Sequence, residues 1–204
     1  MLTPAQVSAW AQRLGVAEAQ VRFDHLLSHL LSGVAAIGDN TVVFIGGTAL
    51  CRTHLVDPPW TRVSEDLDLL VVGDHAAVTA TFERLLPRAI RREFPDVSWV
   101  LAPTQARAPV PAQLRGGTAT VRVQMLPGSG GWASWRRIPR ERRGVCLRYE
   151  DTPGTVELTV PTLEGFAAMK LAAWEDRHAE RDIFDLAALT TLDAFNTDYA
   201  RDLQ

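Results

Sequence analysis

Two aspartates, Asp66 and Asp68, stand two residues apart in the short apolar segment DLDLLVV at residues 66–72. Side chains two residues apart in a strand leave the same face, so a strand here would hold two carboxylates close together. Such like charges are unfavourable unless a cation lies between them. Magnesium suits this position because hard cations take oxygen ligands and leave positions open for substrate phosphates. Two such ions could activate a hydroxyl and stabilise a departing pyrophosphate. A solvated strand end is the alternative interpretation.

A glycine turn precedes the carboxylates. Gly46-Gly47-Thr48 follows the apolar run at 41–45 and leads into a helix expected over 48–55. Glycines let the backbone approach a ligand, and a helix N-terminus offers N–H groups to a phosphate. The pattern is not a Walker A motif, because no Gly-Lys-Ser/Thr follows it. An ordinary tight turn is the alternative, but a glycine turn, a helix and then a carboxylate strand form a more specific pattern than either motif alone.

This combination resembles a known family. The segment FIGGTALCRTHLVDPPWTRVSEDLDLLVV at residues 44–72 is similar to the nucleotidyltransferase core of the AbiEii/MenT toxins, part of the DNA polymerase β-type nucleotidyltransferase superfamily. The resemblance implies that Asp66 and Asp68 bind the metal. It also implies that the nucleotide is held by the glycine turn and by two residues that precede the carboxylates, namely Gly46, Gly47, Thr48, Arg62 and Ser64.

A second match lies at residues 169–189, and it contains the only lysine of the chain, Lys170, among 21 basic residues. An ammonium is a compact point charge, so a retained lysine suggests a place where the forked guanidinium of arginine would not serve. A surface lysine on an amphipathic helix is the alternative interpretation. The resemblance gives Lys170 a role in gripping the triphosphate and neutralising charge as pyrophosphate leaves.

The helix after this lysine supplies the remaining expected site residues. Asp182 is most simply the N-cap of that helix, with Asp185 in its first turn. The resemblance favours Asp185 for a catalytic role, orienting the lysine or an arginine. Arg177, Arg181 and Asp182 are further candidates for nucleotide binding, although arginines on helices are often only solvated.

The family commonly supplies a third carboxylate from a later strand, which should fall within Thr120–Met125. The residue that fits best is Gln124, a poor ligand for magnesium. The third ligand could instead be Glu157 or Asp185, or the second metal could be weakly held. This departure keeps open a catalytically weak binding module with the same fold.

Arginines and tryptophans gather after the glycine-rich break at 128–131. Arginines can bind a phosphate backbone while aromatic rings stack on unpaired bases. With a nucleotidyltransferase core in the same chain, this favours RNA as the acceptor, whereas a solvated face is the alternative. Trp132 and Trp135 accompany the expected RNA-binding residues, which are Arg136, Arg137, Arg140, Arg142 and Arg143. A second cluster, containing Arg84 and Arg88, lies on the helix expected over 75–94.

The resemblance implies a toxin that adds nucleotides to the 3′ end of tRNA, blocks translation and is restrained by a cognate antitoxin. Nucleotidylation of a protein or a small molecule is the alternative activity. The net charge of −3 argues against a protein that coats nucleic acid indiscriminately. Two cysteines form no disulfide framework, and neither a signal peptide nor a membrane span is evident, so we expect a cytoplasmic protein. We expect no zinc site among the five histidines.

Hydrophobic periodicity predicts an α/β (α+β) fold with a mixed sheet flanked by helices at both ends, and the resemblance implies that its core is polymerase β-like. Residues 1–160 would form the core with the N-terminal helices, and 161–204 a helical segment that completes the site. The expected helices cover 4–15, 18–35, 48–55, 75–94, 162–177 and 182–192. The expected strands cover 41–45, 66–72, 98–102, 118–125, 144–149 and 155–160.

Overall fold

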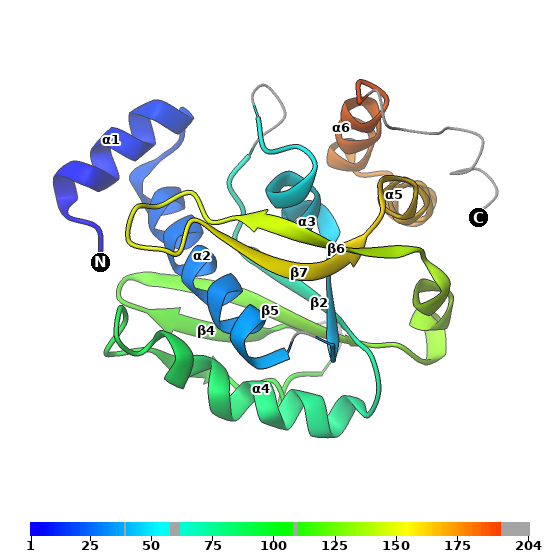
Figure 1. Cartoon of the computed structure of the whole chain (residues 1–204), viewed down its shortest axis with the longest axis horizontal. Coiled ribbons are helices and arrows are strands. Elements are labelled where there is room, and N and C mark those ends of the chain that lie inside the picture. The colour runs from blue at the N-terminus through cyan, green and yellow to red at the C-terminus, as the bar shows by residue number, and fades with distance from the viewer. Residues whose placement is uncertain (39, 58–61, 108–109, 193–204) are drawn as a thin grey trace.

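The computed structural model describes residues 1–38, 40–57, 62–107 and 110–192, which form a mixed α/β fold (Figure 1). The helices are α1 (Pro4–Leu14), α2 (Glu18–Gly38), α3 (Gly46–Thr53), α4 (His75–Ile90), the 3₁₀ helix η1 (Gly130–Arg137), α5 (Leu163–Arg177) and α6 (Glu180–Leu189). The strands are β1 (Val42–Ile45), β2 (Asp66–Val71), β3 (Ser98–Leu101), β4 (Ala112–Gly116), β5 (Ala119–Pro127), β6 (Arg140–Cys146) and β7 (Thr155–Pro161). The predicted fold class is confirmed.

A five-stranded mixed sheet in the order β1-β2-β5-β4-β3 forms the centre of the fold, and β6 and β7 form a separate hairpin. Strand β1 runs antiparallel to β2 and pairs Ile45 with Asp68. Strand β5 runs parallel to β2 on its other side and pairs Asp68 with Gln124. Because of this register, the end of β1 and the middle of β5 flank the same carboxylate. The glycine turn that follows β1 therefore begins beside Asp68.

Both faces of β2 are covered, which is why its sequence is almost continuously apolar. On one face, Leu67 and Leu69 join the main core together with the apolar side of α2. On the other face, Leu70 packs with Ile45 and with Met169 of α5. Asp68 alternates with Leu67 and Leu69 and therefore shares the face of Leu70, which turns it toward α5 rather than α2.

Side-chain capping sets the beginnings of α1 and α5. The Thr3 side chain caps α1 in a capping box with Gln6, and the helix ends at Gly15 in the left-handed region (φ 66°). Thr162 caps α5 through the backbone N–H of Gly165. In Figure 1, α2 crosses the five-stranded sheet, α4 lies below it, and α5 and α6 lie together at the upper right.

Several predicted boundaries were wrong. The sequence analysis missed strand β4, whose five residues are AQLRG. Apart from Gly116, only Ala112 and Leu114 of this strand are buried, so its apolar pattern is weak. Strand β6 begins at Arg140 rather than at 144, because pairing with β7 reaches from Cys146 back to Arg140. Gly130 and Gly131 of the break expected at 128–131 already belong to η1. Helix α4 ends at Ile90, and the predicted segment beyond 192 lies outside the described residues.

Candidate active site

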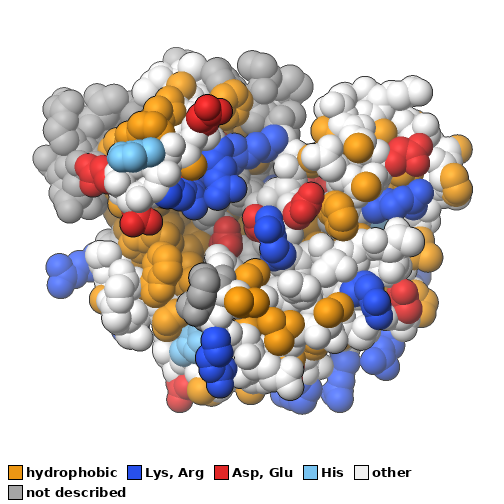
Figure 2. All heavy atoms as spheres, turned by 180° about the vertical axis from the view of Figure 1, so that it is seen from behind, with side chains coloured by type: hydrophobic (Ala, Val, Ile, Leu, Met, Phe, Trp, Pro, Cys, Tyr) orange, Lys and Arg blue, Asp and Glu red, His pale blue; other side chains and the backbone are white. Residues whose placement is uncertain are grey.

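One cavity of about 510 Å³ collects most of the side chains that the sequence singled out. It is lined by the turn between β1 and α3, by β2 and β5, by η1 and by α5 and α6. Figure 2 shows a hollow on the face opposite to that of Figure 1, where basic side chains gather beside acidic ones. The predicted residues that line the cavity are Gly46, Gly47, Thr48, Arg62, Ser64, Asp66, Asp68, Lys170, Arg177 and Arg181.

Other side chains approach the two glycines closely. Gly46 has φ 82°, and a Cβ atom there would lie 2.5 Å from Oδ2 of Asp68. A Cβ atom on Gly47 would lie only 2.2 Å from Nη2 of Arg62. Helix α3 begins at Gly46 rather than at the predicted Thr48, and its N-cap, Ile45, provides no side-chain cap. The N–H groups of this first turn can therefore bind a phosphate that enters the cavity.

A hydrogen bond joins a hydroxyl group of the glycine turn to a hydroxyl group in the segment that leads into β2. Thr48 donates a hydrogen bond of 2.5 Å to the Ser64 hydroxyl, which also accepts one from the backbone N–H of Asp66. Ser64 thereby ties the first turn of α3 to the beginning of β2. This contact holds the glycine turn and the carboxylate strand at a constant separation.

Asp68 is strongly perturbed by its surroundings. Burial, together with the neighbouring Asp66 carboxylate, raises its pKa to about 6, although the Lys170 ammonium acts in the opposite direction. The positive charges nearby therefore compensate the charged form of this carboxyl group only in part. A divalent cation would supply the remaining compensation, and two carboxylates on one strand face are the oxygen ligands that magnesium prefers. The residues present fit such an ion.

Asp66 has a partner that the sequence analysis missed. Arg122 of β5 donates two hydrogen bonds to its carboxylate, from Nε at 2.5 Å and from Nη2 at 3.0 Å. Arg122 and Gln124 alternate with the buried Val121 and Val123 and so share a strand face, and the parallel pairing with β2 places them beside the two aspartates. Arg122 would have to release Asp66 before that carboxylate could bind a metal ion.

The candidates for a third ligand differ in position. Gln124 lies beside Asp68 and lines the cavity. Glu157 is on β7, 3.6 Å from Arg142, and is not among the lining residues. The carboxylate of Asp185 is engaged by two cations. A carboxylate that was not predicted, Glu65, also lines the cavity.

Lys170 is held between two fully buried carboxylates. Its Nζ atom lies 2.6 Å from Oδ2 of Asp185 and 3.0 Å from Oδ1 of Asp182. Arg62 forms a two-point ion pair with Asp185, at 2.9 and 3.0 Å, and Arg177 donates two hydrogen bonds of 2.8 Å to Asp182. The structure thus places Asp185 between an arginine and the lysine, where it can orient both.

The predicted capping role of Asp182 is wrong. Helix α6 begins at Glu180 with Ala179 as its N-cap, so Asp182 lies inside the helix, and Asp185 lies beyond the first turn. Burial acts to raise the pKa of Asp182, but hydrogen bonds from Arg177 and Lys170 hold it below its usual value. Asp182 is therefore an anion that fixes two cations at the wall of the cavity.

The five predicted RNA-binding arginines do not form one surface. Arg136 and Arg137 are exposed on η1, whereas Arg140 folds back onto the carbonyl of Arg136. Arg143 points toward α3 and donates to the carbonyl of Thr53. Arg142 lies beside Glu157, as described above. None of the five lines the cavity.

The tryptophans near these arginines do line the cavity. Trp132 and Trp135 are arranged edge to face, with ring centroids 4.6 Å apart. They give one wall of the cavity flat apolar surfaces next to the exposed Arg136 and Arg137. Such a wall is suited to stacking a base at an entrance with positive charge.

The cavity therefore has two sides of different charge. One side presents Asp66, which is paired with Arg122, and Asp68, which has Gln124 beside it. The other presents the first turn of α3 and a group in which three cations are held by two aspartates, leaving a surplus of positive charge. A cation on the first side and an anionic chain such as a triphosphate on the second would complement this arrangement.

Comparison with known proteins gives concordant results. A family model described as "Nucleotidyl transferase AbiEii toxin, Type IV TA system" matches residues 29–204. Among solved structures, MenT4, a nucleotidyltransferase toxin from Mycobacterium tuberculosis, superimposes with a TM-score of 0.69 at 22% identity, covering 100% of this chain and 69% of that one. An antigenic nucleotidyltransferase-like protein from Paracoccidioides brasiliensis superimposes with a TM-score of 0.54 at 17% identity, covering 89% and 84%.

No curated protein matches the chain in sequence. The similarity to the two solved structures shows the fold alone, because their sequence identities to this chain are 22% and 17%. Within the described residues, no helix combines the length and apolar character needed to span a bilayer.

Proposed function

The chain belongs to the AbiEii family of nucleotidyltransferase toxins of type IV toxin–antitoxin systems, and from this premise we propose that it transfers nucleotides from a nucleoside triphosphate to the 3′ end of tRNA in a magnesium-dependent reaction. The observation that carries the proposal is that Asp66, Asp68 and Lys170 line the same cavity. Modification of the 3′ end would prevent aminoacylation and so block translation.

Asp66 and Asp68 would hold the magnesium ion, or two ions, after Arg122 has turned away from Asp66. Bound Mg²⁺ would supply charge neutralisation at the transferred phosphate and activate the attacking hydroxyl. The first turn of α3 would bind the phosphates through its N–H groups, which is compatible with the absence of a side-chain cap at Ile45.

In the transfer, the 3′ hydroxyl of the acceptor would give up its proton to water, and its oxygen would form a bond to the α-phosphorus while the bond from that phosphorus to the pyrophosphate oxygen breaks. Negative charge then accumulates on the pyrophosphate. Lys170 would stabilise this charge, since Asp182 and Asp185 hold its ammonium in one position. Arg177 and Arg181 line the same side and would add to the positive field. Arg62, fixed by Asp185, would position the nucleotide.

A nucleic-acid acceptor is favoured by the wall formed by η1. Trp132 and Trp135 line the cavity and offer ring surfaces for an unpaired base. The exposed Arg136 and Arg137 could contact the adjacent backbone phosphates. A tRNA 3′ end is single-stranded and presents both features. The cognate antitoxin and a cytoplasmic location belong to the same proposal.

The proposal is tested by incubating the purified protein with Mg²⁺, each labelled nucleoside triphosphate in turn, and total tRNA. We expect label on tRNA with the wild-type protein and none with Asp66→Ala or Lys170→Ala. Oxidising the tRNA 3′ diol with periodate should abolish labelling. Label on a protein or small molecule, with tRNA unlabelled, would transfer the assignment to that acceptor. No transfer by the folded protein would favour a binding module.

Two double variants test the acceptor surface. Arg136→Gln/Arg137→Gln should raise the KM for tRNA while leaving the KM for the nucleotide unchanged. The matched pair Arg84→Gln/Arg88→Gln, exposed on α4, removes the same charge from the second arginine cluster. A loss confined to the α4 pair would contradict the assignment of the η1 surface.

A further inference from the structure

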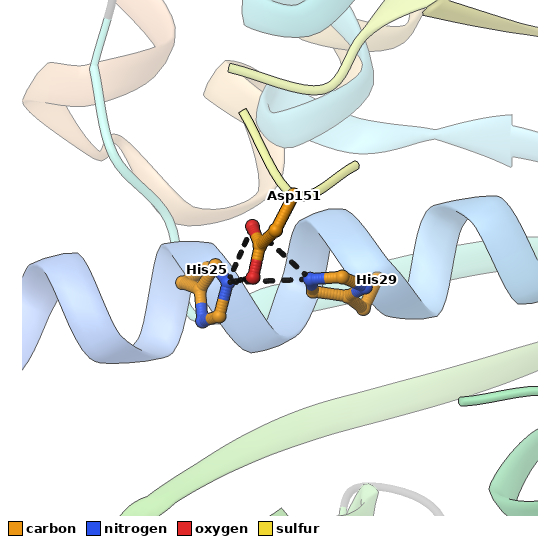
Figure 3. A group of neighbouring side chains, drawn as sticks. All are labelled: His25, His29 and Asp151. Carbon is orange, nitrogen blue, oxygen red and sulfur yellow. Dashed lines mark hydrogen bonds and ion pairs between the residues drawn. The ribbon is translucent and has the colours of Figure 1, made fainter. Parts of the chain in front are cut away.

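A second group of side chains with metal-binding chemistry lies outside the cavity described above. His25 and His29 are four residues apart on α2, and Asp151 is in the connection between β6 and β7 (Figure 3). Nε2 of His25 lies 3.0 Å from both carboxylate oxygens of Asp151, and Nε2 of His29 lies 3.5 Å from Oδ1. The two Nε2 atoms are 3.2 Å apart. None of the three residues lines the nucleotidyltransferase cavity.

These separations agree with a metal coordination sphere. Ligands about 2.0–2.1 Å from a tetrahedral zinc ion are about 3.3–3.4 Å from each other. The three edges of this triangle, 3.0, 3.2 and 3.5 Å, lie around that value. Two imidazoles and one carboxylate also form a ligand set that zinc uses, with its remaining position open to water.

The surrounding side chains keep the two rings in this arrangement. The rings of His25 and His29 are edge to face with an interplanar angle of 87°. Phe94 packs against both, and Tyr149 packs edge to face on His25. Both imidazoles are 4% exposed. The ligand atoms are therefore oriented before any ion binds, which lowers the cost of binding.

The electrostatic surroundings and access also suit a cation. Asp151 contributes a negative charge, whose nearby partner besides the histidines is the N-terminal ammonium of Met1 at 3.5 Å. Asp151 also lines an open cavity of about 430 Å³, which gives an ion a route to the site.

We propose that His25, His29 and Asp151 bind one Zn²⁺ ion, which ties α2 to the connection between β6 and β7. The spacing i,i+4 places the rings of His25 and His29 on one helix face, and the expectation that the histidines contain no zinc site overlooked this spacing. Asp151, by contrast, is 126 residues from His25 in sequence and is brought to it only by the fold. The proposal does not depend on the transferase activity.

The test is the binding of Zn²⁺ by the full chain after treatment with a chelator, in competition with a chromophoric indicator. We expect one equivalent per chain and a rise in the melting temperature, with no displacement by excess Mg²⁺, since imidazole is a poor magnesium ligand. Co²⁺ should show the absorption of a low-symmetry, four- or five-coordinate ion with nitrogen ligands, which requires no variant.

Three variants complete the design. His29→Gln and Asp151→Asn should each weaken Zn²⁺ binding by at least about tenfold, a loss of roughly the size seen when metal ligation is disturbed. His178→Asn is the matched control, because it removes an exposed histidine and asparagine tolerates the left-handed backbone at this position (φ 49°). Equal affinity in the wild type and the two site variants, or no stoichiometric binding by the wild type, would overturn the proposal.

Discussion

The raised pKa of Asp68 leads to a prediction about stability. In the metal-free protein, Asp68→Asn should make folding more favourable at neutral pH, even though it removes a residue assigned to metal binding. The pKa of Asp68 rises from 3.8 to about 6 on folding, chiefly because the carboxyl group is buried. That difference corresponds to roughly 3 kcal/mol against the charged form. Because Asp68 keeps some contact with solvent, we expect a gain of about 1–3 kcal/mol.

The direction of the pKa shift sets the pH range in which Asp68→Asn stabilises the protein. A carboxyl group with a raised folded pKa binds more protons in the folded than in the unfolded state between pH 3.8 and about 6. Wild-type stability therefore falls as the pH rises through this interval, and the full loss is present above it. Asparagine cannot ionise, so the advantage of Asp68→Asn should be large at pH 7.5 and close to zero near pH 4.

The assay is urea or thermal unfolding in the presence of a chelator at these two pH values. A gain of this size would raise the melting temperature by roughly 2–12 °C for a chain of this length. Adding Mg²⁺ should recover stability in the wild type and not in Asp68→Asn. Asp74→Asn is the control, because it removes a carboxylate at the N-cap of α4, where asparagine caps equally well. An equal gain at both pH values, or none at pH 7.5, would refute the reasoning.

Three further predictions concern the cavity wall and the core. Lys170→Arg should retain the fold and lower kcat by about 10²-fold or more, because a guanidinium does not fit between the two buried aspartates; activity close to wild type would argue against a compact-charge requirement. Gly47→Ala should raise the nucleotide KM about 10- to 100-fold by displacing Arg62, and an unchanged KM in steady-state assays would remove Arg62 from nucleotide binding. Asp24→Ala should cost about 3–5 kcal/mol in urea unfolding, because it leaves the buried Arg52 without its partner at 2.8 Å; a loss below 1 kcal/mol would mean that Arg52 finds another partner.

Sequence patterns were sufficient where the controlling interactions are local. The capped starts of α1 and α5 depend on residues three positions apart. The carboxylate strand could be recognised from alternation and apolar content alone, and the glycine turn from its place between a strand and a helix. Similarity to a family then connected these segments with Lys170, which lies about a hundred residues further along the chain.

Patterns failed where a side chain could be explained by more than one local role. Aspartate is a typical N-cap residue, but α6 starts two residues before Asp182. The carboxylate of Asp182 instead binds Lys170 and Arg177. The arginines of β6 are close in sequence, yet successive residues of a strand point to opposite faces. Arg142 and Arg143 therefore have different neighbours.

By itself, the sequence determined the secondary structure that bears the chemistry and the kinds of residue at the site, because these depend on short-range sterics, capping and apolar periodicity. Only the tertiary structure decided which charges meet. The pairing of Arg122 with Asp66 depends on the register between β2 and β5. The contact of Asp151 with His25 depends on the packing of the β6–β7 hairpin against α2. Register and packing are set by burial of the common core, which joins residues from distant parts of the chain and leaves no local pattern to read.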